Sequence, residues 1–135
     1  MLFLFMIASA ILDQCRNRFG RESTIVAVWI LGSAVTERLR EDSDVDFAIY
    51  YEPGTARDFE AHGRLLLDLE AILQRTVDLG RLSSRNLVYA VQATQYGKLL
   101  YARDPHEALA FVSRMQTLYL DLKHDRKIVE DAYCA

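Results

Sequence analysis

The stretch that decides the fold runs from position 29 to position 49 and reads WILGSAVTERLREDSDVDFAI. It opens with an apolar run that ends at Gly32 and Ser33, continues through a polar segment, and leads through Asp44-Val45-Asp46 into a second apolar run. Apolar, β-branched runs bounded by small or polar residues are typical of buried strands. The pattern therefore predicts a strand, a small-residue turn, a short polar connection, and a second strand that opens with two carboxylates.

The two carboxylates are expected on one face of that second strand. Side chains alternate between the faces of a strand, so Asp44 and Asp46 share a face with their Cα atoms roughly 6.5–7 Å apart. Two ionised carboxylates at this spacing repel each other, and a hard divalent cation with oxygen ligands relieves the repulsion. Gly32 lets the backbone approach a polyphosphate, and Ser33 adds a hydroxyl donor. Taken singly, these residues also fit a tight turn and a solvated strand end.

The spacing of Gly-Ser, ten residues and Asp-x-Asp resembles the signature of the polymerase-β-like nucleotidyltransferase superfamily. A third carboxylate, Asp78, stands in Thr76-Val77-Asp78-Leu79, where the family carries one on a later strand. Gly97-Lys98-Leu99-Leu100-Tyr101 is similar to the family's Gly-basic-x-Leu-Tyr ending. Within the superfamily the chain looks like the minimal nucleotidyltransferases, and among these the MntA-type antitoxins that are paired with HEPN ribonuclease toxins. The resemblance extends from about Ile25 to the C-terminal helix.

This resemblance implies an α/β fold, with a small mixed sheet flanked by helices and a long C-terminal helix, in a single domain over residues 1–135. It implies that Asp44, Asp46 and Asp78 are catalytic and bind two Mg²⁺ ions, and that Gly32 and Ser33 hold the phosphates of ATP. The implied reaction transfers AMP from ATP to a tyrosine hydroxyl of a partner HEPN toxin and so inactivates it. The implied partner contact is through the C-terminal helix.

Two alternatives remain open at this point. One is a stand-alone nucleotidyltransferase with a small-molecule acceptor such as an aminoglycoside, and the other is a catalytically weak antitoxin that acts by binding alone. Family members commonly carry arginine and glycine shortly after Gly-Ser, where this chain has Thr36 and Glu37. Without the arginine, the surroundings of the triphosphate are less basic, and without the glycine, the loop is less free to adopt conformations with φ > 0. Both differences favour weak catalysis. The three aspartates favour an active enzyme.

Composition narrows the function classes. With 16 basic and 19 acidic side chains the formal net charge is −3, which argues against broad nucleic-acid binding through clustered cations. Cys15 and Cys134 have no metal-ligand spacing and are expected as reduced thiols of a cytoplasmic protein. The apolar opening of the chain lacks a basic n-region and is too short to span a bilayer, so neither secretion nor membrane insertion is expected.

The three histidines, His62, His106 and His124, form no zinc pattern. Phosphate contacts by Arg38, Arg40 and Lys98 stay open, because each has an equally good structural explanation.

Hydrophobic periodicity and turn signals place the remaining elements. Helices are predicted at 4–19, 56–74, 85–96 and 105–131, and strands at 25–31, 44–49, 76–79 and 98–101. Thr55 is expected to cap the second helix, and Asp104-Pro105 to start the last one. An apolar stripe along the last helix is expected to pack on the sheet: Ala108, Phe111, Met115, Leu118 and Leu122. Apolar residues outside that stripe suggest a partner interface.

Overall fold

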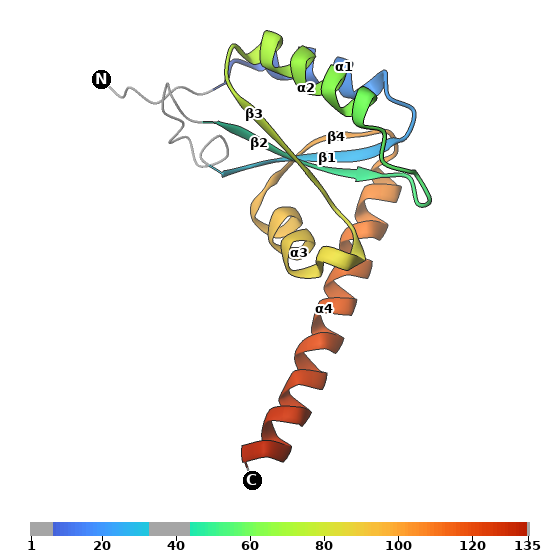
Figure 1. Cartoon of the computed structure of the whole chain (residues 1–135), viewed down its shortest axis with the longest axis vertical. Coiled ribbons are helices and arrows are strands. Elements are labelled where there is room, and N and C mark those ends of the chain that lie inside the picture. Colours follow the sequence, from blue (N-terminus) through green and yellow to red (C-terminus); the bar gives the residue numbers. More distant parts are fainter. Residues whose placement is uncertain (1–6, 33–43, 135) are drawn as a thin grey trace, which may run out of the picture.

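Four strands form one mixed sheet with helices on both faces (Figure 1). The computed structural model describes residues 7–32 and 44–134, without the side chain of Cys134. The strands are β1 (Ile25–Leu31), β2 (Val45–Tyr51), β3 (Val77–Arg81) and β4 (Lys98–Ala102). The helices are α1 (Ser9–Gly20), α2 (Phe59–Leu73), α3 (Leu87–Tyr96) and α4 (Pro105–Cys134), and a 3₁₀ turn over Ser84–Asn86 leads into α3.

Strand direction places the start of β2 beside the end of β1. The order across the sheet is β3-β2-β1-β4; β1 runs antiparallel to β2 and β4, whereas β2 and β3 are parallel. The parallel pair requires a crossover connection, which α2 supplies. The C-terminal end of β1 and the N-terminal ends of β2 and β3 therefore lie side by side at one end of the sheet. This confirms the predicted α/β fold with a small mixed sheet.

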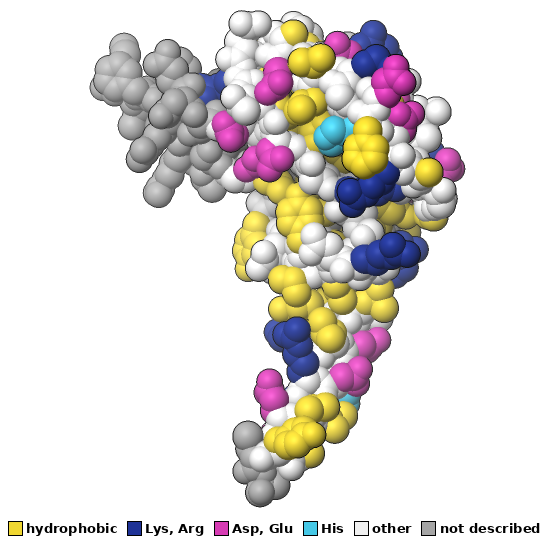
Figure 2. Space-filling model, in the orientation of Figure 1, with side chains coloured by type: hydrophobic (Ala, Val, Ile, Leu, Met, Phe, Trp, Pro, Cys, Tyr) yellow, Lys and Arg dark blue, Asp and Glu magenta, His cyan; other side chains and the backbone are white. Residues whose placement is uncertain are grey.

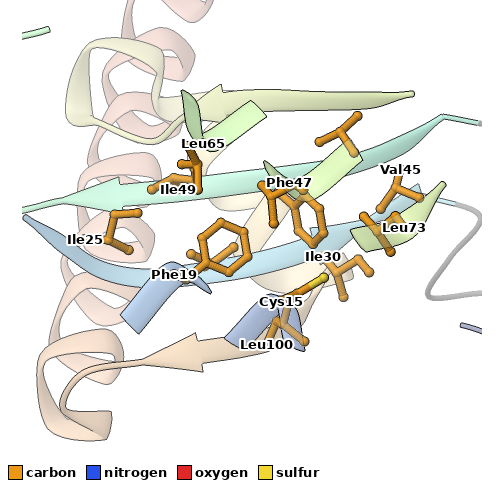
Figure 3. Close-up of a cluster of buried hydrophobic side chains, with 13 residues drawn as sticks. Cys15, Phe19, Ile25, Ile30, Val45, Phe47, Ile49, Leu65, Leu73 and Leu100 are labelled. Carbon is orange, nitrogen blue, oxygen red and sulfur yellow. The ribbon is translucent and has the colours of Figure 1, made fainter. Parts of the chain in front are cut away.

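Each face of the sheet has its own core. On one face, α1 and α2 cover the apolar cluster of Figure 3, in which the rings of Phe19 and Phe47 meet edge to face with centroids 5.3 Å apart. On the other face, α3 and the first part of α4 cover a second cluster, in which Tyr50 stacks on Phe111 at 3.9 Å. Because both faces of β1 are covered, its sequence is a continuous apolar run without alternation.

Local capping explains where the helix boundaries differ from the prediction. Residues 7 and 8 are not helical, and the carbonyl of Ala8 accepts the amide hydrogens of Ile11 and Leu12, so α1 begins at Ser9. The predicted residues 4–6 lie outside the described ones. At α2 the prediction that Thr55 is the cap was wrong: the Asp58 carboxylate accepts the Ala61 amide at 3.0 Å, and the helix starts three residues later than expected.

The last helix packs on the domain only along its first part. Ala108, Phe111 and Met115 are buried as predicted, but Leu118 is already 37% exposed, and the helix then projects away from the sheet (Figure 1). The expectation that the stripe packs on the sheet through Leu122 was therefore only partly right. No helix among the described residues has an apolar stretch long enough to cross a membrane.

Candidate functional site

The candidate site starts at the turn after β1. Gly32 has a φ of +69°, in the left-handed region that L side chains rarely adopt. A Cβ atom at this position would lie 3.4 Å from Oδ2 of Asp46. Glycine here therefore frees the backbone for the tight turn that the sequence pattern predicted, and it lets that turn lie directly against the Asp46 carboxylate. The phosphate contact of Gly32 stays a prediction.

Asp46 and Asp78 are brought together by the parallel strands. They are direct register partners on β2 and β3. Along β2, Val45 and Phe47 belong to the core under α1 and α2, whereas Ala48 belongs to the core under α3 and α4. Strand alternation therefore places Asp46, and with it Asp78, on the face that α3 and α4 cover. The two carboxylates stand at the edge of that face, next to the Gly32 turn.

The electrostatics of this pair are unfavourable in the protein alone. Burial raises the pKa of Asp46 above its ordinary value, and the neighbouring charges of Asp78 and Asp44 raise it further. A half-buried carboxylate with two like charges nearby is a group whose ionised form a divalent cation would stabilise. The donor chemistry thus fits Mg²⁺, which prefers a few carboxylate ligands together with substrate phosphates.

The donor atoms suit a magnesium ion by their chemistry, but the described residues do not arrange them as a complete metal site. In residues 7–32 and 44–134, no three His, Cys, Asp or Glu side chains lie close enough together to hold a metal ion. Asp44 lies one residue before β2 and is exposed, so it is not inside the strand as predicted. It nevertheless adds to the charge around Asp46. The assignment of all three aspartates as metal ligands therefore stays a prediction.

Some predicted residues fall outside the described part of the chain. These are Ser33, the proposed phosphate-binding hydroxyl, and four of the polar residues in the following segment: Thr36, Glu37, Arg38 and Arg40. Lys98 is described and exposed, and it pairs with Ile30 across β1 and β4. Ile30 belongs to the core under α1 and α2, so the register places Lys98 on the sheet face opposite to Asp46. This placement disfavours the phosphate contact that the sequence left open for Lys98.

The histidine and cysteine expectations can be checked in the described residues. His62, His106 and His124 are exposed, and none belongs to a metal-binding group there. Cys15 is a buried free thiol, and its burial raises the thiol pKa to about 11. A thiol of this kind is an inert core residue at neutral pH.

Sequence reasoning missed a glycine and a tyrosine at the back of the site. Gly80 lies two residues after Asp78 on the same face of β3, and the hydroxyl oxygen of Tyr89 from α3 lies 2.0 Å from where a Gly80 Cβ would be. Burial raises the pKa of Tyr89, and the charges of Asp78 and Asp46 add to the shift. A glycine inside a strand often marks a close approach, which was the available signal.

The comparisons with known proteins agree with this architecture. A family model described as "Polymerase beta, Nucleotidyltransferase" matches residues 13–106. The chain is similar to the crystal structure of a toxin–antitoxin with AMP-PNP, with 20% identity and a TM-score of 0.68 over 93% of this chain and 98% of that one. It is similar to a structure of the toxin–antitoxin MntA-HepT, with 19% identity and a TM-score of 0.67 over 95% and 100%.

A third similar structure is that of a tri-AMPylated Shewanella oneidensis HEPN toxin in complex with MNT antitoxin, with 21% identity and a TM-score of 0.63 over 92% of this chain and 99% of the other. No curated protein matches the chain. At these identities, the three structures show that the chain shares their fold.

Proposed function

The chain belongs to the polymerase beta nucleotidyltransferase family, and from this premise we propose that it transfers AMP from ATP to a tyrosine hydroxyl of a partner HEPN ribonuclease toxin. In this role it acts as the antitoxin of the pair in the cytoplasm, where ATP is available. The observation that carries the proposal is the in-register pair of Asp46 and Asp78 beside the Gly32 turn. The choice of acceptor is supported by the shared fold with structures of toxin–antitoxin pairs, one of which holds an AMPylated toxin.

The reaction is an in-line displacement at the α-phosphorus of ATP. A bond forms between the tyrosine oxygen and the α-phosphorus, the bond from the α-phosphorus to the bridging oxygen breaks, and pyrophosphate leaves. In the proposed reaction, Asp78 accepts the proton of the tyrosine hydroxyl. Mg²⁺, when bound, would neutralise charge on the phosphates and on the attacking oxygen.

The chain's own residues supply binding and positioning. Asp44 and Asp46, completed by Asp78, would hold the metal ions. The Gly32 backbone and the Ser33 hydroxyl would hold the β- and γ-phosphates. Most of the rate would then come from orientation and charge neutralisation, because phosphoryl chemistry needs little covalent participation by the protein. The AMP group would inactivate a ribonuclease by charge repulsion and occlusion of RNA.

The projecting part of α4 is our candidate for the toxin contact. Beyond the domain this helix exposes large apolar side chains: Leu120 (64% exposed), Ile128 (55%), Val129 (53%) and Tyr133 (87%). Figure 2 shows hydrophobic side chains along this projection. Apolar surface of this kind usually marks association with another protein. In the proposed reaction, a partner bound there would supply the acceptor tyrosine.

Transfer of label from radioactive ATP tests the proposal. The chain is mixed with its proposed HEPN toxin partner, Mg²⁺ and ATP labelled at the α-phosphate, and the toxin is examined for bound label and ribonuclease activity. We expect labelling by the wild type, loss of labelling in Asp46→Asn and Asp78→Asn, and unchanged labelling in Asp58→Asn, whose side chain only caps α2. Full neutralisation of the toxin by an Asp44→Asn/Asp46→Asn variant would instead indicate an antitoxin that acts by binding alone.

A further inference from the structure

Tyr89 reaches the back of the carboxylate site from α3. The hydroxyl oxygen and the Cζ atom lie 2.0 Å and 2.8 Å from where a Gly80 Cβ would be, so the phenol end rests directly on the sheet over Gly80. The register partner of Gly80 on β2 is Ala48, a fully buried residue. The two smallest side chains of the parallel pair thus form a shallow shelf, and the phenol end of Tyr89 occupies it.

The shelf adjoins the carboxylates. Ala48 and Gly80 follow Asp46 and Asp78 by two residues along the same face of β2 and β3. Two residues of strand correspond to about 6.6 Å between Cα atoms, a separation that one bridging water between the Tyr89 hydroxyl and the Asp78 carboxylate can span. Among the described residues the Tyr89 hydroxyl has no hydrogen-bond partner, so its donor is free for such a contact.

We propose that Tyr89 is a positioning residue of the nucleotidyl-transfer site, whose hydroxyl donates a hydrogen bond, through one bridging water, to the Asp78 carboxylate. The inference rests on the proposed function, because it assigns Asp78 to that site. The bond fixes the orientation of a carboxylate that is otherwise exposed at the start of a short strand. Gly80 is required because any larger side chain would displace the phenol.

Two variants distinguish the contribution of the Tyr89 hydroxyl from that of the packing of Tyr89 on Gly80. Tyr89→Phe removes the hydroxyl and keeps the ring, whereas Gly80→Ala keeps the hydroxyl but drives it off the shelf. The matched controls are Tyr50→Phe, on the same sheet face but stacked on Phe111, and Gly63→Ala, where an added Cβ meets no atom within 4 Å. The measurement is the melting temperature at saturating AMP-PNP as a function of Mg²⁺ concentration. It reports occupancy of the site without requiring turnover.

We expect the Mg²⁺ concentration for half of the stabilisation to rise about fivefold in Tyr89→Phe and in Gly80→Ala, the factor that corresponds to one lost hydrogen bond. Both controls should match the wild type. If Mg²⁺ stabilises the wild type, and both test variants need the same Mg²⁺ concentration for half of the stabilisation as the wild type does, the role of Tyr89 is overturned. The proposed function would then still stand. A wild type that does not respond at all would overturn the proposed function and this inference together.

A second readout uses no nucleotide. In protein labelled at the tyrosine ¹³Cζ position, the Tyr89 resonance is assigned by its absence in Tyr89→Phe. It should move in Asp78→Asn and stay in place in Asp58→Asn, which alters a carboxylate at the distant start of α2. A Tyr89 resonance that is the same in Asp78→Asn as in the wild type would overturn the proposed contact.

Discussion

Asp46 and Asp78 face each other as register partners across β2 and β3, which are the two parallel neighbours in the described sheet. Each stands near the start of its strand, where a parallel pair brings equivalent ends together. Burial and the charges of Asp78 and Asp44 raise the pKa of Asp46, so the ionised pair destabilises the folded chain when no cation is bound. Functional sites often carry this kind of local cost to stability.

Asp46→Asn should therefore stabilise the protein in the absence of Mg²⁺ and nucleotide. We expect the melting temperature at pH 7 to rise by about 2–4 °C, because the substitution removes a half-buried charge and its repulsion. The folded-state pKa of Asp46 lies above its unfolded value, so the penalty is absent below the unfolded pKa and appears as pH rises through the folded one. The gain should consequently vanish near pH 3. Thermal melts at both pH values test this, and a lower melting temperature at pH 7 would contradict it.

Gly97 should not tolerate a side chain. A Cβ there would lie 2.4 Å from the Ala93 carbonyl oxygen and 2.5 Å from Cδ2 of Leu31, although the backbone φ of −78° is ordinary. Gly97→Ala should lower the free energy of unfolding by about 2 kcal/mol through overpacking between α3 and β1. Gly63→Ala in α2 is the control and should be neutral or stabilising by up to about 1 kcal/mol. Urea denaturation measures both, and equal stabilities would contradict the close approach.

The buried guanidinium of Arg18 is stabilised by ion pairs with Asp68 and Glu22. Its side chain is 7% exposed, with Nε donating to Asp68 at 2.6 Å and Nη1 donating to Glu22 at 3.0 Å. Asp68→Ala should cost about 2 kcal/mol, less than for a fully buried pair, because Asp68 is half exposed and Glu22 remains. Glu60→Ala breaks the exposed pair with Arg64 and should cost less than about 1 kcal/mol. A larger loss in Glu60→Ala than in Asp68→Ala, measured by denaturation, would be inconsistent with this network.

The projecting half of α4 should matter for association and not for folding. Ile128→Glu combined with Val129→Glu alters side chains that are more than half exposed, so the melting temperature should stay within about 2 °C of the wild type. The same variant should lose co-purification with the HEPN toxin, because two buried charges at an apolar interface are strongly unfavourable. Lys127→Glu on the same helix turn is the control and should retain the toxin. Retention by the double variant would place the interface elsewhere.

The fold was predictable because its signals are local and strong. The apolar run that forms β1 and the Asp104-Pro105 start of α4 carry their structure in adjacent residues, and Asp104 does accept the His106 amide at 2.9 Å. The start of α2 was missed because two residues, Thr55 and Asp58, could both cap it, and only the position of the preceding turn selects Asp58.

The site was predictable only as far as spacing fixes it. The Gly-Ser and Asp-x-Asp spacing contained the approach of Gly32 to the start of β2, where Asp46 lies. Asp78 joins Asp46 through the parallel pairing of β2 and β3, and only the family resemblance pointed to it. The approach of Tyr89 to Gly80 depends on how α3 packs across the sheet. No short-range pattern encodes that packing, so sequence reasoning missed both residues.

Calorimetric titration of ATP, with and without Mg²⁺, tests the central claim most directly. That claim is that Asp46, Asp78 and the Gly32 turn form one magnesium-dependent nucleotide site. We predict binding heat for the wild type that disappears when EDTA removes Mg²⁺ and in both Asp46→Asn and Asp78→Asn, and that persists in Asp58→Asn. Undiminished binding in the Asp46 and Asp78 variants, or no binding by the wild type with Mg²⁺ present, would contradict the claim.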